Sequence, residues 1–274
     1  MVRRRTALGV IGIAGIAALG AGCSASLVPT AAAAPRLRSL GAPPSIPRSI
    51  SAPVERAPRF LAPALVKAAK PNGAIFGLPG DAPIVALTVD DGASTAVVAA
   101  YAKFASDTGT RITFFLNGKR HSWTDNAPAL RPLVGTGQVQ IANHTWSHPD
   151  LRSLSTGQIV DELMSNHDFI AKTFGVDARP YFRPPYGYRN GHVDAAAASV
   201  GYTVPVMWYG SLSDASEISD ADLLDAAHRW IRPRHIVIGH ANFPTVTRHF
   251  ARLEHIMRER GLAPVTLHDV FARV

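Results

Sequence analysis

The sequence predicts an α/β fold in which helices connect the parallel strands of one sheet, arranged as a barrel or as a doubly wound sheet. The chain has 274 residues and is 47% hydrophobic, which is enough for one large packed domain. Short β-rich apolar runs alternate along it with longer amphipathic segments. The short runs are apolar on both faces, which is typical of parallel strands that are covered on both sides.

The expected elements follow in order from this alternation. Apolar runs of strand length predict strands at 83–89, 111–117, 138–144, 202–208, 235–240 and 264–267. The segments between them predict helices at about 94–107, 127–135, 156–174, 191–200, 219–232 and 245–260. In both candidate folds, the chemistry is expected at the carboxyl ends of the strands.

Residues 1–22 have the order of a secretory signal: three arginines, a short apolar stretch rich in Ala and Gly, and then small residues. A membrane anchor is the alternative, although the apolar stretch is short beside the ~20 residues that a spanning helix needs. Cys23 follows "LGAG" and resembles a bacterial lipidation site, whereas cleavage near Ala34 in "TAAAAP" satisfies the ordinary small-residue rule equally well. All of these alternatives predict export, to the cell envelope or the outside of the cell.

Residues 23–72 are predicted to be a linker, and residues 73–274 the globular domain. The linker is rich in Pro, Ala, Ser and Arg and has no helix or strand period. The formal charge of +8 is concentrated ahead of the domain, because residues 1–70 contain ten basic residues and one acidic residue. The domain itself is close to neutral, so we exclude nucleic acid as its partner. No protein partner is predicted.

Ionisable residues gather at the positions where a parallel sheet carries its chemistry. They are Asp90 and Asp91 at the end of the first expected strand, His144 and His148 after the third, His240 at the end of the fifth, and Arg183 and Tyr186 in "FRPPYGYRNG". Because the carboxyl ends of parallel strands meet at one edge of the sheet, we expect these residues to lie together.

Two of these groups together indicate a metal site. Adjacent carboxylates such as Asp90 and Asp91 repel each other, and a metal ion would hold them together. His144 and His148 are four residues apart, so on a helical turn they would share a face and reach one ion. Two histidines and one carboxylate leave positions open for water and substrate, which is the arrangement of a catalytic site.

Other interpretations of these residues remain open at this point. The aspartates could simply cap the helix that is expected to begin near Ser94. Two histidines and one carboxylate also hold iron in oxygenases, although there the ligands usually lie within one motif, which "HTWSH" does not provide.

The second aspartate and His240 have expected roles as proton carriers. Successive side chains of an extended strand face opposite ways, so one carboxylate can bind the metal while its neighbour stands beside it as a base. A metal lowers the pKa of its bound water to about 7, which a carboxylate can then deprotonate. His240 is suited to protonating a leaving amine or alkoxide near neutral pH.

Four segments in a fixed order, "TVDD", "HTWSH", "RPPYG" and "IVIGH", resemble the motifs of the polysaccharide deacetylase family, carbohydrate esterase family four, which contains the chitooligosaccharide deacetylases. The resemblance runs from about residue 83 to the end of the chain. It implies a distorted (β/α) barrel of parallel strands with fewer than eight regular βα units and an active site at the C-terminal ends of the strands.

The resemblance also implies a role for each site residue. Asp90 would be the catalytic base, and the metal ligands would be Asp91, His144 and His148. The other implied roles are the orientation of the base by Arg183, an oxyanion contact from the backbone N–H of Tyr186, an acetyl-methyl pocket lined by Ile238, and proton donation by His240.

The fourth family motif is incomplete in this chain. It usually reads Asp-x-x-Asp-Trp after a strand that contains Trp. Here "WYGSLSDA" retains Trp208 and Asp214, but Ser211 and Ala215 replace the first Asp and the last Trp. We expect Asp214 to pair with Arg183 or His240, and Trp208 to contribute to the substrate groove.

The resulting expectation is an exported, metal-dependent carbohydrate N-deacetylase, with zinc as the first choice of metal and cobalt or another divalent ion as alternatives. The expected substrate carries N-acetylglucosamine-type residues, in peptidoglycan or chitin-like oligomers. Two alternatives stay open: an O-acetyl esterase on xylan that uses the same residues, or an envelope protein that binds glycan with little or no turnover. Lipidation of Cys23 would attach the protein to a membrane.

Overall fold

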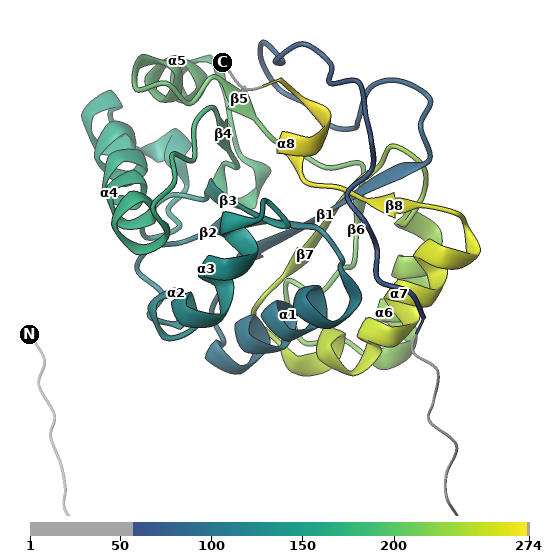
Figure 1. Cartoon of the computed structure of the whole chain (residues 1–274). Coiled ribbons are helices and arrows are strands. Elements are labelled where there is room, and N and C mark those ends of the chain that lie inside the picture. Colours follow the sequence, from purple (N-terminus) through teal and green to yellow (C-terminus); the bar gives the residue numbers. More distant parts are fainter. Residues whose placement is uncertain (1–56, 273–274) are drawn as a thin grey trace, which may run out of the picture. The chain divides into compact units, whose positions relative to one another are not determined.

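The computed structural model describes residues 57–272, and the expected signal, its cleavage site and Cys23 lie outside the described residues. Eight strands form one parallel sheet in the order β5-β4-β3-β2-β1-β7-β6, with β8 paired to β1 outside this path. Figure 1 shows the strands at the centre of the domain with helices around them. The distorted (β/α) barrel is therefore confirmed, with several units that are much shorter than a regular barrel strand.

The strands that carry most of the sheet are those that the apolar runs predict. Their bounds are Ile84–Asp91 (β1), Ile112–Leu116 (β2), Val139–Asn143 (β3), Val204–Pro205 (β5), Ile236–His240 (β7) and Ala263–Pro264 (β8). The sequence analysis missed two further strands, Tyr181–Phe182 (β4) and Gly210–Ser211 (β6). Each has only two residues and lies in no longer apolar run, whereas β5 and β8, which also have two residues each, overlap the longer strands expected at 202–208 and 264–267.

The longer helices also match the expected positions. They are Thr95–Thr108 (α1), Ala127–Gly135 (α3), Thr156–Phe174 (α4), Gly191–Ser199 (α5), Asp220–Trp230 (α6) and Phe250–Glu259 (α7). The structure adds two one-turn helices, Ser122–Asp125 (α2) and Leu267–Val270 (α8), and the 3₁₀ helices Leu151–Ser153 (η1), Pro185–Gly187 (η2) and Pro244–His249 (η3). The single helix expected at 245–260 is in fact η3 followed by α7.

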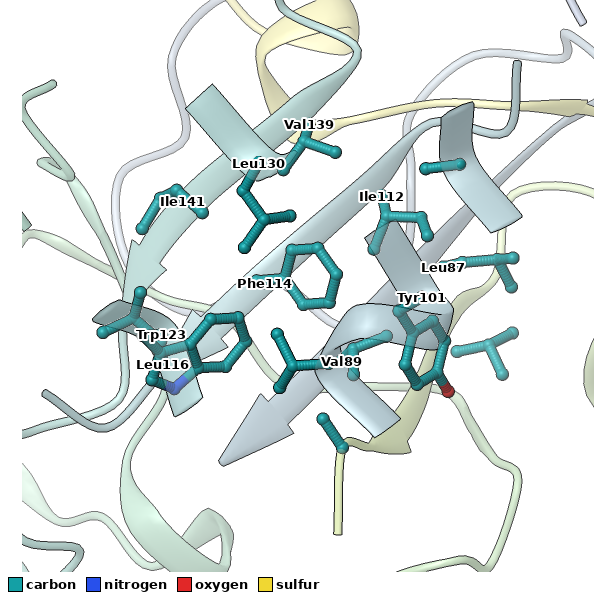
Figure 2. Close-up of a cluster of buried hydrophobic side chains, with 14 of the residues drawn as sticks. Leu87, Val89, Tyr101, Ile112, Phe114, Leu116, Trp123, Leu130, Val139 and Ile141 are labelled. Carbon is teal, nitrogen blue, oxygen red and sulfur yellow. The ribbon is translucent and has the colours of Figure 1, made fainter. Parts of the chain in front are cut away.

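The alternation of side chains along the strands separates two environments. On the outer face of the sheet, Leu87, Phe114 and Ile141 pack against Tyr101 of α1 and Leu130 of α3 (Figure 2). On the inner face, apolar residues of the same strands, such as Ala86 and Phe115, form a second buried cluster. The ionisable residues of the expected site lie at the carboxyl ends of these strands, with Asp90 and Asp91 at the end of β1 and His240 at the end of β7.

Residues 57–72, which the composition assigns to the linker, lie against the domain. The Phe60 N–H donates to the carbonyl of Thr108 at 2.7 Å, and Ala68 forms a β-bridge with Phe271. The Arg258 guanidinium lies 4.1 Å from the centre of the Phe60 ring. The packed unit therefore begins before residue 73, because a few apolar anchors in a Pro- and Ala-rich segment suffice to dock it. Among residues 57–272, no helix is long and apolar enough to cross a membrane.

Candidate active site

Asp90 lies at the carboxyl end of β1 and is almost fully buried. Its Oδ1 accepts a hydrogen bond from Arg183 Nη1 at 2.6 Å, and its Oδ2 lies 3.5 Å from His144 Nε2. Strand pairing sets Asp90 opposite His240 of β7, so the expected base and the expected acid extend from neighbouring strands on the same face of the sheet. The two residues are thereby held at one edge of the sheet by backbone hydrogen bonds.

Asp91 turns out of the strand, which corrects the expectation that the two carboxylates face opposite ways. Its φ is +71°, in the left-handed region, so the alternation of an extended strand ends before it. Its Oδ1 lies 3.4 Å from His144 Nε2, the same nitrogen that Asp90 approaches. Neither aspartate caps α1, because Ser94 is its N-cap and accepts from the N–H of Val97 at 3.4 Å.

His144 and His148 converge through a loop rather than a helical turn. Thr145 and His148 both have positive φ, of +68° and +66°, which bends the chain back on itself between the two histidines. A buried amide holds this loop, because Asn117 Nδ2 donates to the carbonyls of His144 at 2.5 Å and Thr145 at 3.1 Å. The spacing of four residues thus brings both rings to one point, but for a different geometric reason than the one expected.

Hydrogen bonding determines which nitrogen of His144 faces Asp91. Its Nδ1 lies 2.7 Å from the carbonyl oxygen of Arg183, which can only accept, so Nδ1 carries the proton and Nε2 is left with its lone pair in the neutral ring. Burial lowers the pKa of His144, but the nearby carboxylates of Asp90 and Asp91 raise it above its ordinary value. For His148, burial and the nearby charge of His144 lower the pKa to about 4, so this ring is neutral at pH 7.

Asp91, His144 and His148 fit a divalent metal ion. One ligand atom from each residue lies within 4.8 Å of the others. Asp91 Oδ1 is 3.4 Å from the Nε2 atoms of both histidines, is buried, and has no hydrogen-bond partner among the described residues. Burial raises the pKa of Asp91, but the nearby rings of His144 and His148 bring it well below its usual range. A deprotonated carboxylate and two imidazoles are a donor set that divalent transition metals prefer.

Arg183 is fully buried in the expected orienting position. Besides Asp90, its guanidinium donates to Thr88 Oγ1 at 2.9 Å and to the backbone carbonyls of Val206 and Met207 at 2.8 and 3.2 Å. It lies 4.1 Å from the centre of the Phe115 ring and 5.6 Å from that of Trp208. Hydrogen bonds from all three nitrogens and an aromatic ring against its plane hold the guanidinium in place. The position of Asp90 therefore depends on a group that has little freedom to move.

Tyr186 forms the wall of the site next to His148. Its φ is +60°, and its ring centroid is 4.5 Å from that of His148. Tyr188 continues this wall, with its ring 5.5 Å from Tyr186 and the Arg152 guanidinium 3.8 Å above it. Both tyrosines are well exposed, at 58% and 45%. Trp208 is half-buried and packs against Gly187, the residue after Tyr186.

His240 and Asp214 form a pair on the other side of the site. His240 Nδ1 lies 3.0 Å from Asp214 Oδ1, and the His240 backbone N–H donates to Asp214 Oδ2 at 3.2 Å. Of the two expected partners of Asp214, the structure therefore brings it to His240. Burial lowers the pKa of His240, but the hydrogen bond to Asp214 and the charge of Asp90 raise it above 6.5. Ile238 is buried two residues before His240, on the same face of β7.

Strained backbone marks the site independently of its side chains. Within residues 57–272, six non-glycine residues have positive φ. Four of them are Asp91, Thr145, His148 and Tyr186, and a fifth, Ser213, precedes Asp214. Such conformations cost about 1–3 kcal/mol each and persist where the surroundings enforce them, which is common at functional sites.

Sequence reasoning missed the amide side chains that support the site. Asn117 holds the histidine loop, and Asn242 donates to Asp91 Oδ2 at 2.6 Å. Neither belongs to a motif that the sequence analysis used. The one available signal is position, because each follows the end of a strand by one or two residues.

Comparison with known proteins identifies the family. Residues 78–205 match the model of the polysaccharide deacetylase family. This match confirms the resemblance seen in the four motifs, and these residues belong to the polysaccharide deacetylase family.

Individual relatives share the sequence or the fold. Chitin deacetylase 1 of Cryptococcus neoformans is 35% identical over 139 residues, which are 51% of this chain and 28% of that protein. The family 4 carbohydrate esterase from Streptomyces lividans, solved in complex with acetate, is 26% identical with a TM-score of 0.59, covering 66% of this chain and 91% of that chain. A pseudoenzyme of the CE4 family from Bacillus anthracis has the same fold, with a TM-score of 0.63 at 22% identity over 73% of this chain and 70% of that chain. This chain spans between 26% and 48% of the length of the first three curated relatives that it matches.

Proposed function

We propose that this protein is a metal-dependent deacetylase that hydrolyses the N-acetyl group of N-acetylglucosamine-type residues in a carbohydrate polymer or oligomer. Three groups meet at one edge of the sheet, and this observation carries the proposal. They are the buried base candidate Asp90, the acid candidate His240, and the three possible metal ligands Asp91, His144 and His148, which we call the metal corner. Asp90 pairs with Arg183 at 2.6 Å, and Asp91 Oδ1 faces both histidines at 3.4 Å. The family membership and the chitin deacetylase relative support the same reaction.

The proposed chemistry divides the proton transfers between the two sides of the site. When bound, a divalent ion supplies an acidified water and polarises the acetyl carbonyl. Asp90, held by Arg183, accepts the proton of the attacking water. The backbone N–H of Tyr186 donates to the oxyanion that develops on the acetyl carbonyl oxygen. His240, whose pKa is raised by Asp214 and Asp90 against the effect of burial, donates a proton to the departing sugar nitrogen.

Zinc is our first choice of metal, because two imidazoles and one carboxylate suit it, and cobalt or another divalent ion fits the same donor set. The exposed rings of Tyr186 and Tyr188 offer an apolar wall beside the metal corner, against which a sugar ring can lie. We take N-acetylglucosamine residues of peptidoglycan as the first substrate, and chitin-like oligomers as the second.

An O-acetyl esterase is the second candidate function, and the carbohydrate esterase from Streptomyces lividans favours it. It would use the same residues on a xylan-type substrate. A glycan-binding protein without turnover is the third, because a pseudoenzyme has the same fold. The presence of Asp90 and His240, each with its partner, supports turnover over mere binding.

The test is acetate release by the purified protein after removal of metal and reconstitution with zinc or cobalt. The substrates are N-acetylglucosamine oligomers, peptidoglycan and acetylated xylan, and the Asp90→Asn variant is measured beside the wild type. We expect metal-dependent release from the N-acetylated substrates and a loss of about 10²–10⁴-fold in kcat for the variant. Release from acetylated xylan alone would favour the esterase, and metal binding without release from any substrate would favour the glycan-binding protein.

Export is a separate proposal, which the sequence of residues 1–22 supports. The mass of the mature amino terminus distinguishes its forms. A lipid-modified residue 23 would indicate membrane attachment, and a terminus near residue 35 would indicate release after ordinary cleavage. A chain that keeps its first residues in the cytoplasm would contradict export.

A further inference from the structure

Asn242 contacts the carboxylate of the proposed metal ligand Asp91. Its Nδ2 donates to Asp91 Oδ2 at 2.6 Å, and its Oδ1 accepts from the N–H of Ala93 at 3.0 Å. The second bond determines how the amide is turned, because only the oxygen can accept from a backbone N–H. The NH₂ group of Asn242 is thereby directed at the carboxylate.

The position of Asn242 depends on the same strand pair that carries the proposed base and acid. Beyond the pairing of Asp90 with His240, the Ala241 N–H donates to the Asp90 carbonyl at 2.9 Å, and the Ser94 N–H donates to the Ala241 carbonyl at 3.1 Å. With the two bonds of the Asn242 amide, four hydrogen bonds join the end of β1 and the loop after it to the loop after β7. The backbone on the amino-terminal side of Asn242 is therefore held at both the N–H and the carbonyl of Ala241.

This contact makes the two oxygens of Asp91 unequal. Oδ2 is occupied by the Asn242 amide, whereas Oδ1 faces His144 Nε2 and His148 Nε2 at 3.4 Å each and has no hydrogen-bond partner among the described residues. Hydrogen bonds to a ligating carboxylate orient it, and such partners contribute to metal affinity.

We propose that Asn242 is a positioning residue that presents Asp91 to a metal ion through Oδ1 alone. The inference rests on the proposed function, in which Asp91, His144 and His148 hold a divalent ion. A carboxylate that binds through one oxygen leaves more of the coordination sphere open for water and substrate than one that binds through both. An amide is required at position 242, because the side chain must accept from Ala93 and donate to Asp91 at the same time.

Two substitutions test this role. Asn242→Asp keeps the shape and the acceptor for Ala93 but replaces the donor by a carboxylate that repels Asp91. Asn242→Ala removes both contacts. The matched control is Gln138→Ala, because the Gln138 amide also joins two segments, by donating to the carbonyls of Ala105 and Thr110, but lies before β3, at the opposite end of the strand from the metal corner.

The measurement is the dissociation constant for Zn²⁺ and Co²⁺, obtained by competition with a chelating dye, together with the visible absorption spectrum of the Co²⁺ form. We expect both Asn242 variants to bind about 10–100-fold more weakly than the wild type and to alter the Co²⁺ spectrum. We expect Gln138→Ala to retain the wild-type affinity and spectrum even where its melting temperature falls. A saturating metal concentration should restore much of the lost activity to Asn242→Ala.

Unchanged affinity and an unchanged Co²⁺ spectrum in both Asn242 variants would overturn the proposed role. A variant that melts earlier without metal, yet gains the wild-type increment in melting temperature on metal binding, would overturn it too, because Asn242 would then only support the loop. A wild-type protein that binds neither ion would instead contradict the proposed function, and this inference with it.

Discussion

Arg183 and Asp90 form an ion pair in which both side chains are buried, with Arg183 Nη1 2.6 Å from Asp90 Oδ1. The two residues come from segments 93 positions apart in the sequence. The guanidinium also holds the backbone of residues 206 and 207 and the hydroxyl of Thr88, so it links β1 to the chain that follows β5. The pair thus connects the proposed base to the frame of the barrel.

Removing the Arg183 guanidinium should destabilise the fold and impair the reaction together. Arg183→Met leaves the Asp90 charge buried without its partner, which costs about 3–5 kcal/mol for a pair of this kind. Arg183→Lys keeps the charge but cannot reproduce the fork of hydrogen bonds, so we expect it to recover stability better than kcat. Urea unfolding and acetate release measure the two effects.

The control for this prediction is Arg179→Met, which removes an arginine whose partner is the exposed Asp177. A surface pair contributes little, so stability and activity should stay near those of the wild type. A fall in stability for Arg179→Met equal to that for Arg183→Met would contradict the argument from burial.

The pH at which kcat/KM falls on the alkaline side should depend on Asp214. The hydrogen bond and charge of Asp214 help to raise the pKa of His240 against the effect of burial, so Asp214→Asn should lower that pKa. As His240 is proposed to act as the protonated acid, the upper limb of the kcat/KM profile should move to lower pH in the variant. The pH dependence of kcat/KM measures this directly.

The ion pair of His240 and Asp214 also affects stability. Because the pKa of His240 is raised in the folded protein, its contribution to the free energy of unfolding is fully present below the ordinary value of 6.5 and is lost as the pH rises through the raised value.

The matched control for the activity prediction is Asp220→Asn, which removes the partner of His249 elsewhere on the domain and should leave the high-pH limb of the kcat/KM profile in place. An upper limb that is the same in wild type and Asp214→Asn would refute the assignment of that limb to His240.

Metal binding should release protons at mildly acidic pH. In the metal-free protein, Asp90 and Asp91 raise the pKa of His144 above 6.5 despite its burial, whereas His148, with a pKa of about 4, is already neutral. Because a ligating imidazole must be neutral, we expect more than about half a proton to be released per ion at pH 6.5. The apparent affinity should then rise with pH until the pKa of His144 is passed.

Calorimetric titrations in two buffers with different ionisation enthalpies measure this release. A heat of binding that does not depend on the buffer would contradict the prediction. His148→Ala should weaken binding through the loss of a ligand but keep the proton release, since that proton belongs to His144.

The aromatic wall should matter more for long substrates than for short ones. Tyr188 is 45% exposed and contacts Tyr186, whose ring in turn contacts His148, so a sugar ring next to the reacting one is the group that would contact Tyr188. We expect Tyr188→Ala to raise KM for tetramers of N-acetylglucosamine by roughly fivefold, which corresponds to about 1 kcal/mol of lost contact energy, with little change for dimers of the same sugar. Tyr209→Ala removes a tyrosine that is more exposed, at 61%, but packs on Trp230 and His235, and should affect neither substrate. Equal effects of Tyr188→Ala on both chain lengths would contradict the placement.

The sequence predicts the fold well where an element is long enough to show a pattern. The strands at 84–91 and 236–240 follow from apolar runs, and the helix at 156–174 from its amphipathic period. The strands at 181–182 and 210–211 could not be predicted, because two residues carry no period and pair only when their neighbours have already formed the sheet. The packing of residues 57–72 against the domain was not predicted for a similar reason, because it depends on isolated contacts such as those of Phe60.

What the sequence determines by itself is the set of chemical groups and the end of the sheet to which each belongs. Asp90, His144 and His240 lie at the ends of apolar runs that become parallel strands of one sheet, so their placement at the same edge is already implied by strand direction. Only the tertiary structure decides their geometry. The left-handed turn at Asp91, the bent loop between the two histidines and the contact of Asn242 with Asp91 Oδ2 all depend on packing between segments far apart in the chain. Local sequence cannot encode these contacts, because such strained conformations are stable only when the surrounding fold enforces them.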